Sequence, residues 1–275
     1  MKKTIVSVIL AAVLPLSGFC QKLVILHTND THSHLEAFRD NGHGGVIERA
    51  AFIDSVRNAE GPQNVLLLDA GDISQGTPYF TLGAGVYEDR LVHAMGYDCL
   101  TMGNHEFDNG LDALADRFSR YTIPVVCANL TLKGTPLEQY VSPFVVIERG
   151  GLKIGIIGFA PSLKGLVSAG VTGSVKNIDA FKVGNKYAKI LKKRYKCDLV
   201  IALSHLGYGG AERHAERECD MNLAAKTRNI DIIVGGHSHT DLKAPSYVEN
   251  LDGKKVMVVQ DFCWGEYVGK IDIKY

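Results

Sequence analysis

Cysteine is scarce in this sequence, and the few that occur form no paired motif. There are 6 cysteines among 275 residues, with no Cys-x-x-Cys spacing, so a cysteine-based zinc site and a cysteine nucleophile find little support. Disulfides stay open as an alternative if the protein is exported. Cys99, Cys127 and Cys197 lie in or beside apolar runs. We expect these three to be buried free thiols.

An excess of charge of one sign is also missing. Lys plus Arg and Asp plus Glu each total 30, so no net field attracts nucleic acid or an anionic membrane surface. No basic stripe with interleaved aromatic residues occurs, and we expect no nucleic acid as a structural partner. With 46% hydrophobic and 22% charged residues, the composition is that of an ordinary soluble globular protein, long enough for one sizeable core.

The sequence contains no apolar run long enough to cross a membrane. The run at residues 5–16 follows two lysines and precedes small residues, which is the pattern of a secretory signal peptide. We predict a signal peptide over residues 1–20 and one mature domain over residues 21–275 that is exported, either periplasmic or secreted. A lipid anchor on Cys20 is a less favoured alternative, because Phe19 stands where a small residue is normally required.

Strand-like and helix-like segments alternate along most of the chain. Short apolar, β-branched-rich runs predict buried strands, and they span residues 23–26, 65–68, 97–102, 199–203 and 230–234. Helical spacing of apolar residues predicts helices between them, over residues 45–57, 83–95, 111–120, 181–194 and 213–228. This alternation is typical of an α/β protein with a mainly parallel sheet.

Two regions break the alternation. Residues 141–148 and 152–159 are separated by two glycines, which predicts an antiparallel hairpin. Residues 255–260 and 267–273 predict two more strands joined by a Cys-Trp-Gly turn region. We expect a second, partly antiparallel sheet, packed against the first, to contain them. No G-x-G-x-x-G spacing is present, which argues against a dinucleotide site.

A short polar cluster follows each of the five predicted strands. The clusters are Asp30-Thr-His32, Gly71-Asp72, Gly103-Asn-His-Glu106, Ser204-His205 and Gly236-His-Ser-His239. In open α/β sheets, ligand groups collect just beyond the carboxyl ends of the strands. The clusters together therefore predict a site, although any one of them alone would be weak evidence.

Seven side chains in these clusters are donors that suit divalent transition metals. They are Asp30, His32, Asp72, Asn104, His205, His237 and His239. The Asp72 carboxylate has two oxygens and can bridge two ions, which gives each ion four protein ligands. Without metal, gathering these groups would cost several kcal/mol. We therefore favour a binuclear site, and the mixed oxygen and nitrogen donors suit Mn, Zn, Fe and Co alike.

His105 follows Asn104 directly and is left over from the donor set. We interpret it as the general acid that protonates a leaving group, with Asp108 accepting a hydrogen bond from its second ring nitrogen. The alternative is that His105 is only a turn residue. Two cations and such an acid suit in-line displacement at a phosphate.

These motifs resemble those of the calcineurin-like metallophosphoesterases, and within them the catalytic domain of the 5′-nucleotidase family. The motifs are Leu26-His-Thr-Asn-Asp-Thr-His32, Asp69-Ala-Gly-Asp72, Met102-Gly-Asn-His-Glu-Phe-Asp108 and Val234-Gly-Gly-His-Ser-His239. The resemblance runs from about residue 23 to residue 275. It implies a four-layer α/β/β/α sandwich in which two mixed sheets are flanked by helices, and a metallophosphoesterase catalytic domain over residues 21–275.

The resemblance also implies a role for each site residue. One metal takes Asp30, His32, Asp72 and His239, and the other takes Asp72, Asn104, His205 and His237. His105 and Asp108 form the catalytic dyad.

Full-length 5′-nucleotidases carry a further C-terminal domain that supplies aromatic stacking and arginines for the nucleotide, and this sequence has no counterpart of it. We expect hydrolysis of phosphomonoesters such as nucleoside 5′-phosphates, and the sequence does not identify substrate-binding residues. One alternative is a catalytic subunit that needs a separate C-terminal-domain protein. Another is a sulfur-ester hydrolase of the same fold.

Four further polar residues have weaker expectations. Asn129 follows a predicted strand and is a candidate for hydrogen bonding to substrate or to a metal-bound water. His34 and His43 are possible cleft residues, but surface or strand-end roles are favoured. His27, on an apolar strand, is expected to be a satisfied core residue.

Overall fold

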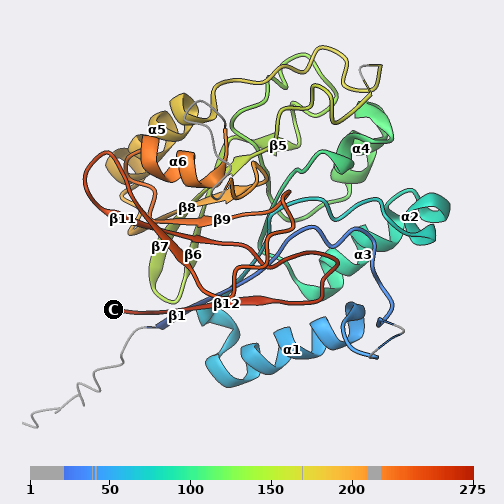
Figure 1. The fold of residues 1–275 in the computed structure, drawn as a ribbon, viewed down its shortest axis with the longest axis horizontal. Coiled ribbons are helices and arrows are strands. Elements are labelled where there is room, and N and C mark those ends of the chain that lie inside the picture. Colours follow the sequence, from blue (N-terminus) through green and yellow to red (C-terminus); the bar gives the residue numbers. More distant parts are fainter. Residues whose placement is uncertain (1–21, 39, 41, 169, 210–217) are drawn as a thin grey trace, which may run out of the picture.

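Two sheets lie face to face between two layers of helices (Figure 1). The structure is a computed structural model that describes residues 22–275 except 39, 41, 169 and 210–217. The expected signal peptide and Cys20 lie outside the described residues. The four-layer α/β/β/α sandwich that the sequence resemblance implies is confirmed.

The first sheet has six strands among the described residues, and all but one run parallel to their neighbours. In spatial order they are β12 (Gly269–Lys274), β1 (Lys22–Thr28), β2 (Val65–Asp69), β3 (Cys99–Thr101), β4 (Val125–Val126) and β5 (Val141–Ser142). The exception is the edge strand β12, which is antiparallel to β1.

The second sheet also has six strands among the described residues, with four parallel strands in the centre and an antiparallel strand at each edge. In spatial order they are β10 (Ser246–Glu249), β11 (Lys255–Val259), β9 (Ile232–Val234), β8 (Leu199–Ser204), β7 (Leu152–Phe159) and β6 (Phe144–Arg149).

Helices cover the outer face of each sheet (Figure 1). Outside the first sheet are α1 (Gly45–Glu60), α2 (Pro78–Gly83), α3 (Val86–Met95) and α4 (Gly110–Ser119). Outside the second are α5 (Ala180–Ile190), which continues as a π-helical turn over Leu191–Tyr195, and α6 (Asp220–Lys226). Single 3₁₀ turns occur at Pro62–Asn64 and His105–Phe107. Among the described residues, no helix combines the length and apolarity needed to span a membrane.

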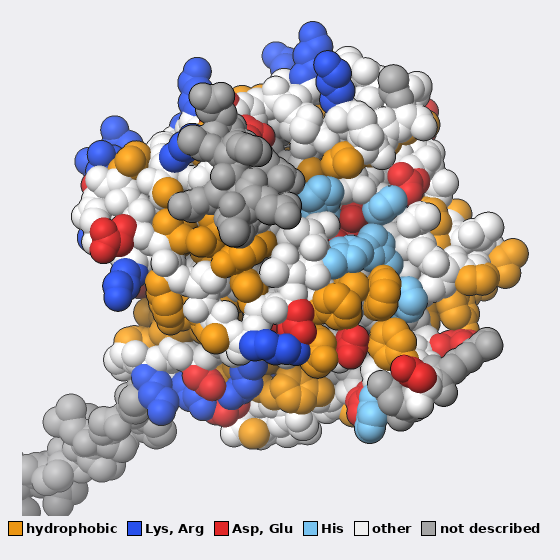
Figure 2. All heavy atoms as spheres, in the orientation of Figure 1, with side chains coloured by type: hydrophobic (Ala, Val, Ile, Leu, Met, Phe, Trp, Pro, Cys, Tyr) orange, Lys and Arg blue, Asp and Glu red, His pale blue; other side chains and the backbone are white. Residues whose placement is uncertain are grey.

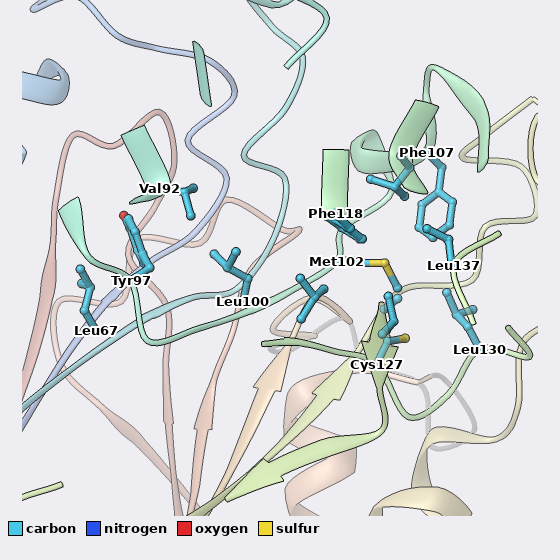
Figure 3. Close-up of a cluster of buried hydrophobic side chains, with 14 of the residues drawn as sticks. Leu67, Val92, Tyr97, Leu100, Met102, Phe107, Phe118, Cys127, Leu130 and Leu137 are labelled. Atoms are coloured by element: carbon cyan, nitrogen blue, oxygen red, sulfur yellow. The ribbon is translucent and has the colours of Figure 1, made fainter. Parts of the chain in front are cut away.

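Side-chain alternation along the strands explains the layers. In β1, Leu23 and Ile25 face the second sheet, whereas Val24 and Leu26 face the helices. Successive strand residues point to opposite faces, so strands that are apolar throughout must be covered on both sides. Figure 3 shows this outer cluster, in which Leu67 lies near Tyr97 at one end and Met102 lies near Phe118 at the other.

The expectation for the cysteines is confirmed. Cys99, Cys127 and Cys197 are buried and free, as are the other two cysteines in the described part of the chain, Cys219 and Cys263.

The helix predicted over residues 83–95 is confirmed over Val86–Met95, which is α3, but it begins later than predicted. Gly83 ends α2, and Ala84 and Gly85, whose φ angles are 49° and 93°, separate the two helices. A left-handed backbone ends the first helix, and glycine tolerates such a conformation readily. The helix predicted over residues 213–228 is helical only over Asp220–Lys226 among the described residues, and its beginning lies outside them.

The strand predicted over residues 141–148 is two strands in different sheets. Val141 and Ser142 pair with β4 in the first sheet, and Phe144 begins β6 in the second. Pro143 stands between them, lacks a backbone N–H and limits continued pairing. The hairpin of β6 and β7 is confirmed.

The prediction that the second sheet contains both C-terminal strands is also wrong for one of them. Strand β11 lies in the second sheet, but β12 crosses to the edge of the first and pairs with β1. One side of β1 pairs with β2, and β12 pairs with the other side, which would otherwise be the edge of the sheet.

Candidate metal centre

The loops at the carboxyl ends of five strands converge at one edge of the two sheets. These loops follow β1, β2 and β3 in the first sheet and β8 and β9 in the second, and they carry the donors Asp30, His32, Asp72, Asn104, His205, His237 and His239. Figure 2 shows histidine side chains gathered on this face with acidic side chains among them. The structure thus brings together side chains that are up to about two hundred positions apart in sequence.

One half of the centre is formed by Asp30, His32 and His239, whose ligand atoms all lie within 4.8 Å of one another. The Nε2 atoms of the two histidines are 3.0 Å apart. Asp30 Oδ1 is 3.2 Å from His239 Nε2 and 3.8 Å from His32 Nε2. Ring nitrogens and a carboxylate oxygen that lie this close together can act as ligands of one cation.

The other half is formed by Asp72, His205 and His237, which also lie within 4.8 Å of one another. Asp72 Oδ2 is 3.0 Å from His205 Nε2 in this half and 4.0 Å from His32 Nε2 in the first. The Asp72 carboxylate therefore lies between the two halves, as a bridging ligand would.

Most of these donors lie in a strained backbone conformation. Left-handed φ angles of 46° to 73° occur at Asp30, His32, Asp72, His237 and His239. Each such residue other than glycine costs about 1–3 kcal/mol and persists only where the surroundings hold it. The strain turns successive side chains into the cavity instead of letting them alternate as they do in a strand.

Glycines let the ligand loops approach one another. A Cβ atom on Gly103 would overlap the Asp72 carboxylate, and one on Gly236 would lie 2.8 Å from His205 Nδ1. Gly71, with φ of 93°, packs in the same way against the Gly103 backbone. A side chain at any of these positions would push the donors apart.

Hydrogen bonds to backbone carbonyls orient two of the histidine rings. His205 Nδ1 donates to the carbonyl of Ala70 at 2.6 Å, and His32 Nδ1 donates to that of Gln75 at 3.2 Å. Both bonds place the proton on Nδ1 and leave Nε2 as the lone-pair atom that faces the carboxylates. Metal-binding histidines are usually held in this way.

Unpartnered buried atoms show that the donor set fits a cation. Asn104 Oδ1 is buried and has no hydrogen-bond partner among the described residues, and the buried His205 Nε2 faces the carboxylates of Asp72 and Asp30 at 3.0 Å and 3.6 Å. Burial opposes protonation of His205, but the facing carboxylates of Asp72 and Asp30 raise its pKa to about 10. Without a metal, the cluster thus requires a proton where a cation would otherwise supply the positive charge.

Glu106 stabilises the loops that carry the donors. No role was predicted for it from the sequence. Its buried carboxylate accepts the backbone N–H groups of Asp72 at 2.9 Å and Gly103 at 2.7 Å, together with those of Ile73 and Ser74. It therefore fixes the Asp72 loop against the Asn104 loop. Its place in the Gly103–Glu106 cluster is the one signal that points to it.

The His105–Asp108 pair lies beside the donors. His105 Nδ1 donates to Asp108 Oδ2 at 2.8 Å, and the His105 backbone N–H donates to Asp72 Oδ1 at 2.8 Å. Both side chains are about one-third exposed. Burial by itself would lower the pKa of His105, but the hydrogen bond to Asp108 and the Asp72 carboxylate raise it above its ordinary value.

A cavity of about 520 Å³ opens onto the donors. His105 lines it, as do Leu166 and Trp264, which the sequence analysis did not consider. His34 lines it too, so the favoured surface role is wrong and the cleft role is correct. His43 is exposed.

The prediction that Asn129 hydrogen-bonds to substrate or to a metal-bound water is wrong. Its side chain is fully buried and makes two hydrogen bonds to the backbone of Ala160, at 2.8 Å and 2.9 Å. It therefore joins the end of β4 to the end of β7 and has no free donor or acceptor for a substrate. His27 is buried with Nδ1 3.0 Å from Asp261 Oδ2, as expected of a paired core residue.

Comparison with known proteins shows the family. The family model described as calcineurin-like phosphoesterase matches residues 23–241. The chain belongs to the calcineurin-like phosphoesterase family. Its clustered carboxylates and histidines agree with that family.

Its relatives include 5′-nucleotidases. That of Rattus norvegicus is 34% identical over 295 residues, which cover 97% of this chain and 49% of the rat protein. The solved 5′-nucleotidase precursor of Thermus thermophilus has a TM-score of 0.81 and 34% identity, covering 92% of this chain and 51% of that chain. The NAD nucleotidase of Haemophilus influenzae has a TM-score of 0.77 and 30% identity, and the match covers 92% of this chain and 47% of that chain.

The chain spans about half the length of these relatives. It corresponds to the N-terminal domain of the 5′-nucleotidase family.

Proposed function

We propose that this chain hydrolyses phosphomonoesters, in particular nucleoside 5′-phosphates or related nucleotides, with two divalent cations. The observation that carries the proposal is the clustering of six donors in two adjoining groups with Asp72 between them, while Asn104 lines the same cavity. The similarity to 5′-nucleotidases supports the substrate class.

In this proposal Asp30, His32, Asp72 and His239 hold one cation, and Asp72, Asn104, His205 and His237 hold the other. When bound, such cations neutralise phosphate charge and make water nucleophilic at neutral pH. The chain itself orients the substrate by holding the donors rigidly through the strained loops and Glu106.

His105 supplies the proton for the leaving group. Its Nδ1 is committed to Asp108, so Nε2 is the atom that can donate to the oxygen of the departing alcohol. Asp108 keeps the ring oriented and favours its protonated form. The alcohol leaves with that proton, and His105 is reprotonated from solvent through the open cavity.

A metal and substrate panel tests the proposal. The protein is stripped with EDTA, reloaded with Mn²⁺, Zn²⁺ or Co²⁺, and assayed for phosphate release from AMP, UDP-glucose, a cyclic nucleotide and simple esters. Metal content is measured on the same samples. We expect metal-stimulated release from the nucleoside 5′-phosphate. The absence of metal-stimulated turnover on every mono-, di- and cyclic ester would defeat the proposal.

A matched pair of histidine variants tests the dyad. His105→Asn should lower the turnover number by about 10²–10⁴-fold, because the leaving group then departs without a positioned acid. His43→Asn is the control, since its ring is exposed and does not line the cavity. Equal activity of the two variants would reject the role of His105.

Two alternative functions can each be tested directly. If a separate chain supplies the nucleotide-binding half, co-expression with a C-terminal-domain protein should give a larger complex and higher turnover, whereas a fully active monomer argues against it. If the bond cleaved is a sulfur ester, thiosulfonate substrates should be preferred over phosphates in a side-by-side assay.

We also propose that residues 21–275 form the catalytic domain after export and removal of residues 1–20. The support is the charged, apolar and small-residue pattern of the leader. N-terminal sequencing of the protein recovered outside the cytoplasm would reveal the cleavage point, and recovery of an unprocessed cytoplasmic chain would contradict the proposal.

A further inference from the structure

We propose that this domain has its own binding site for the planar aromatic leaving group of its substrate, such as a nucleobase. The site is a groove walled by His34, Phe38, Tyr79 and Trp264, which we call the aromatic groove. The inference rests on the proposed function, because it assigns the groove to the leaving group of a phosphoester. In Figure 2, hydrophobic side chains lie directly against the band of histidines.

The rings of the groove are aligned as a stacking surface. The His34 ring is 5.4 Å from that of Trp264 and 6.1 Å from that of Phe38, and both interplanar angles are 29°. Near-parallel rings in series present flat faces to a further flat ring. On the opposite side of the groove, Tyr79 is held by a hydrogen bond from its hydroxyl to Glu36 at 2.6 Å.

Trp264 is fixed to the metal centre itself. Its backbone N–H donates to the carbonyl of Asp30 at 2.6 Å, and its ring contacts that of His239 edge-on at 6.5 Å. Its φ angle is 62°, so a left-handed turn directs this large side chain toward the cavity. The side chain is nevertheless 38% exposed, and burial in the core therefore does not explain its position.

The metal cavity and the groove are neighbours with a shared wall. His34 lines both the cavity of about 520 Å³ at the donors and a second hollow of about 620 Å³ that contains Phe38 and Tyr79. Each volume is in the range that small-molecule ligands occupy. A phosphoester whose phosphate lies at the donors can therefore extend its leaving group past His34 onto the aromatic faces.

A flat aromatic occupant explains this composition better than a flexible apolar chain does. Stacking on aromatic side chains is tolerant of base identity, because every base has a flat face. The hollow beyond His34 is lined by one carboxylate, Glu36, by the hydroxyls of Thr77 and Tyr79, and otherwise mainly by apolar side chains. It should thus select for planarity and much less for a particular base.

Fluorescence of Trp264 gives a readout that does not depend on hydrolysis, because it is the only tryptophan in the sequence. Adenosine and ribose are each titrated into the full protein, in EDTA and with Mn²⁺. We expect saturable quenching by adenosine in both conditions and none by ribose. No saturable change with adenosine, or the same change with ribose, overturns the inference.

Kinetics with two substrates provide the second arm. Trp264→Leu and Phe38→Leu should each raise KM for AMP by about tenfold, the loss expected from one stacking contact. For Phe38→Leu, which does not line the metal cavity, KM for glycerol phosphate, which has no ring, should stay unchanged, as should kcat for both esters. For Trp264→Leu, the loss should be larger with AMP than with glycerol phosphate. Tyr267→Leu is the matched control, because this exposed aromatic residue lies three positions from Trp264 and lines neither hollow.

The two arms separate the possible failures. Equal loss on AMP and glycerol phosphate contradicts a leaving-group site. Hydrolysis without adenosine quenching rejects the groove alone, whereas quenching without hydrolysis of any ester rejects the proposed function and the assignment to a leaving group. If Trp264→Leu does not fold, the titration of the native protein and Phe38→Leu still decide.

Discussion

Two clusters of buried charge in this protein lie side by side and differ in how completely their atoms are paired. In the first, which we call the structural ion pair, Arg117 donates to Asp89 from Nε at 3.1 Å and from Nη2 at 2.8 Å. Its Nη1 donates to Ser74 Oγ, and Tyr121 donates to the same carboxylate. Both charged side chains are more than nine-tenths buried.

The metal centre is the opposite case. Its ring nitrogens face one another, as in the 3.0 Å approach of His32 to His239, and the Asn104 carbonyl oxygen lacks a partner among the described residues. Asp30, Asp72 and His205 are buried at least as deeply as the structural ion pair, whereas the His239 side chain is about one-third exposed. The difference shows that complete pairing marks a cluster built for stability, while buried donors aimed at a common point mark one built for a ligand. Ser74 links the two, because its backbone N–H donates to Glu106 behind the metal loops.

The largest effect should come from removing the bridge in the metal centre. Asp72→Asn keeps the size of the side chain but removes the charge, and phosphate release should fall by about 10³-fold or more, since the cations supply several kcal/mol of transition-state stabilisation. The fold should persist in circular dichroism. Asp112→Asn, an exposed change on α4, is the control and should match the native rate. Near-native activity of Asp72→Asn would remove the bridging role.

The reverse effect is expected at the structural ion pair. Arg117→Met should lower the free energy of unfolding by about 3 kcal/mol, because the buried Asp89 loses its closest counter-charge and is left with the Tyr121 hydroxyl and with Arg120 at 3.9 Å. Urea denaturation measures this loss. The double variant Arg117→Met/Asp89→Leu should recover part of it, because no charge then remains buried without a partner. A double variant less stable than the single one would mean that the pair matters for more than charge balance.

Metal binding should distinguish the two clusters directly. Adding Mn²⁺ or Zn²⁺ to the EDTA-treated protein, at about a hundredfold its dissociation constant, should raise the free energy of unfolding by about 2.7 kcal/mol. The Arg117→Met variant should show the same increment from a lower baseline, and Asp72→Asn should show little or none. A full increment in Asp72→Asn would place the cation elsewhere.

The smallest effect is expected at Asp69, whose pairing is intermediate between that of the structural ion pair and that of the metal centre. This buried carboxyl accepts only two hydrogen bonds, from Thr28 and Gly71, and burial raises its pKa to about 7 from 3.8. The folded form therefore holds the proton more tightly than the unfolded form does. Stability from this group is fully present at low pH and is lost as the pH rises from about 4 to about 7.

The test of Asp69 is a pH series of denaturation curves in EDTA. Asp69→Asn should remove this loss, so that the native protein weakens relative to the variant between roughly pH 4 and pH 8. Parallel curves for the two proteins across that range would show that Asp69 is already ionised in the folded state.

Prediction from the sequence succeeded where a local pattern has a single physical meaning. Strands such as β1 and β2 are apolar throughout and end in polar residues, so both the strands and the clustering of side chains beyond them follow from the sequence. It failed where the same signal has two meanings. Asn129 follows a strand as Asn104 does, but its amide is used to join β4 to β7.

The remaining misses depend on long-range geometry. The apolar run across Pro143 shows no change in periodicity, yet the chain changes sheets there. Strand β12 alternates well but carries no mark of its partner β1. Glu106 and Trp264 acquire their positions from backbone amides and left-handed turns, which side-chain periodicity does not report.

The loop before β12 also bears on when the metal centre can assemble. Asn29 accepts a hydrogen bond from the backbone N–H of Asp261, 232 positions later, and the carbonyl of Asp30 accepts one from the backbone N–H of Trp264. On the ribosome, the earliest donors emerge long before these residues, and contacts of such separation form late in folding. A product that stops before this loop thus carries most of the coordinating groups but lacks the contacts that hold the first of them in place.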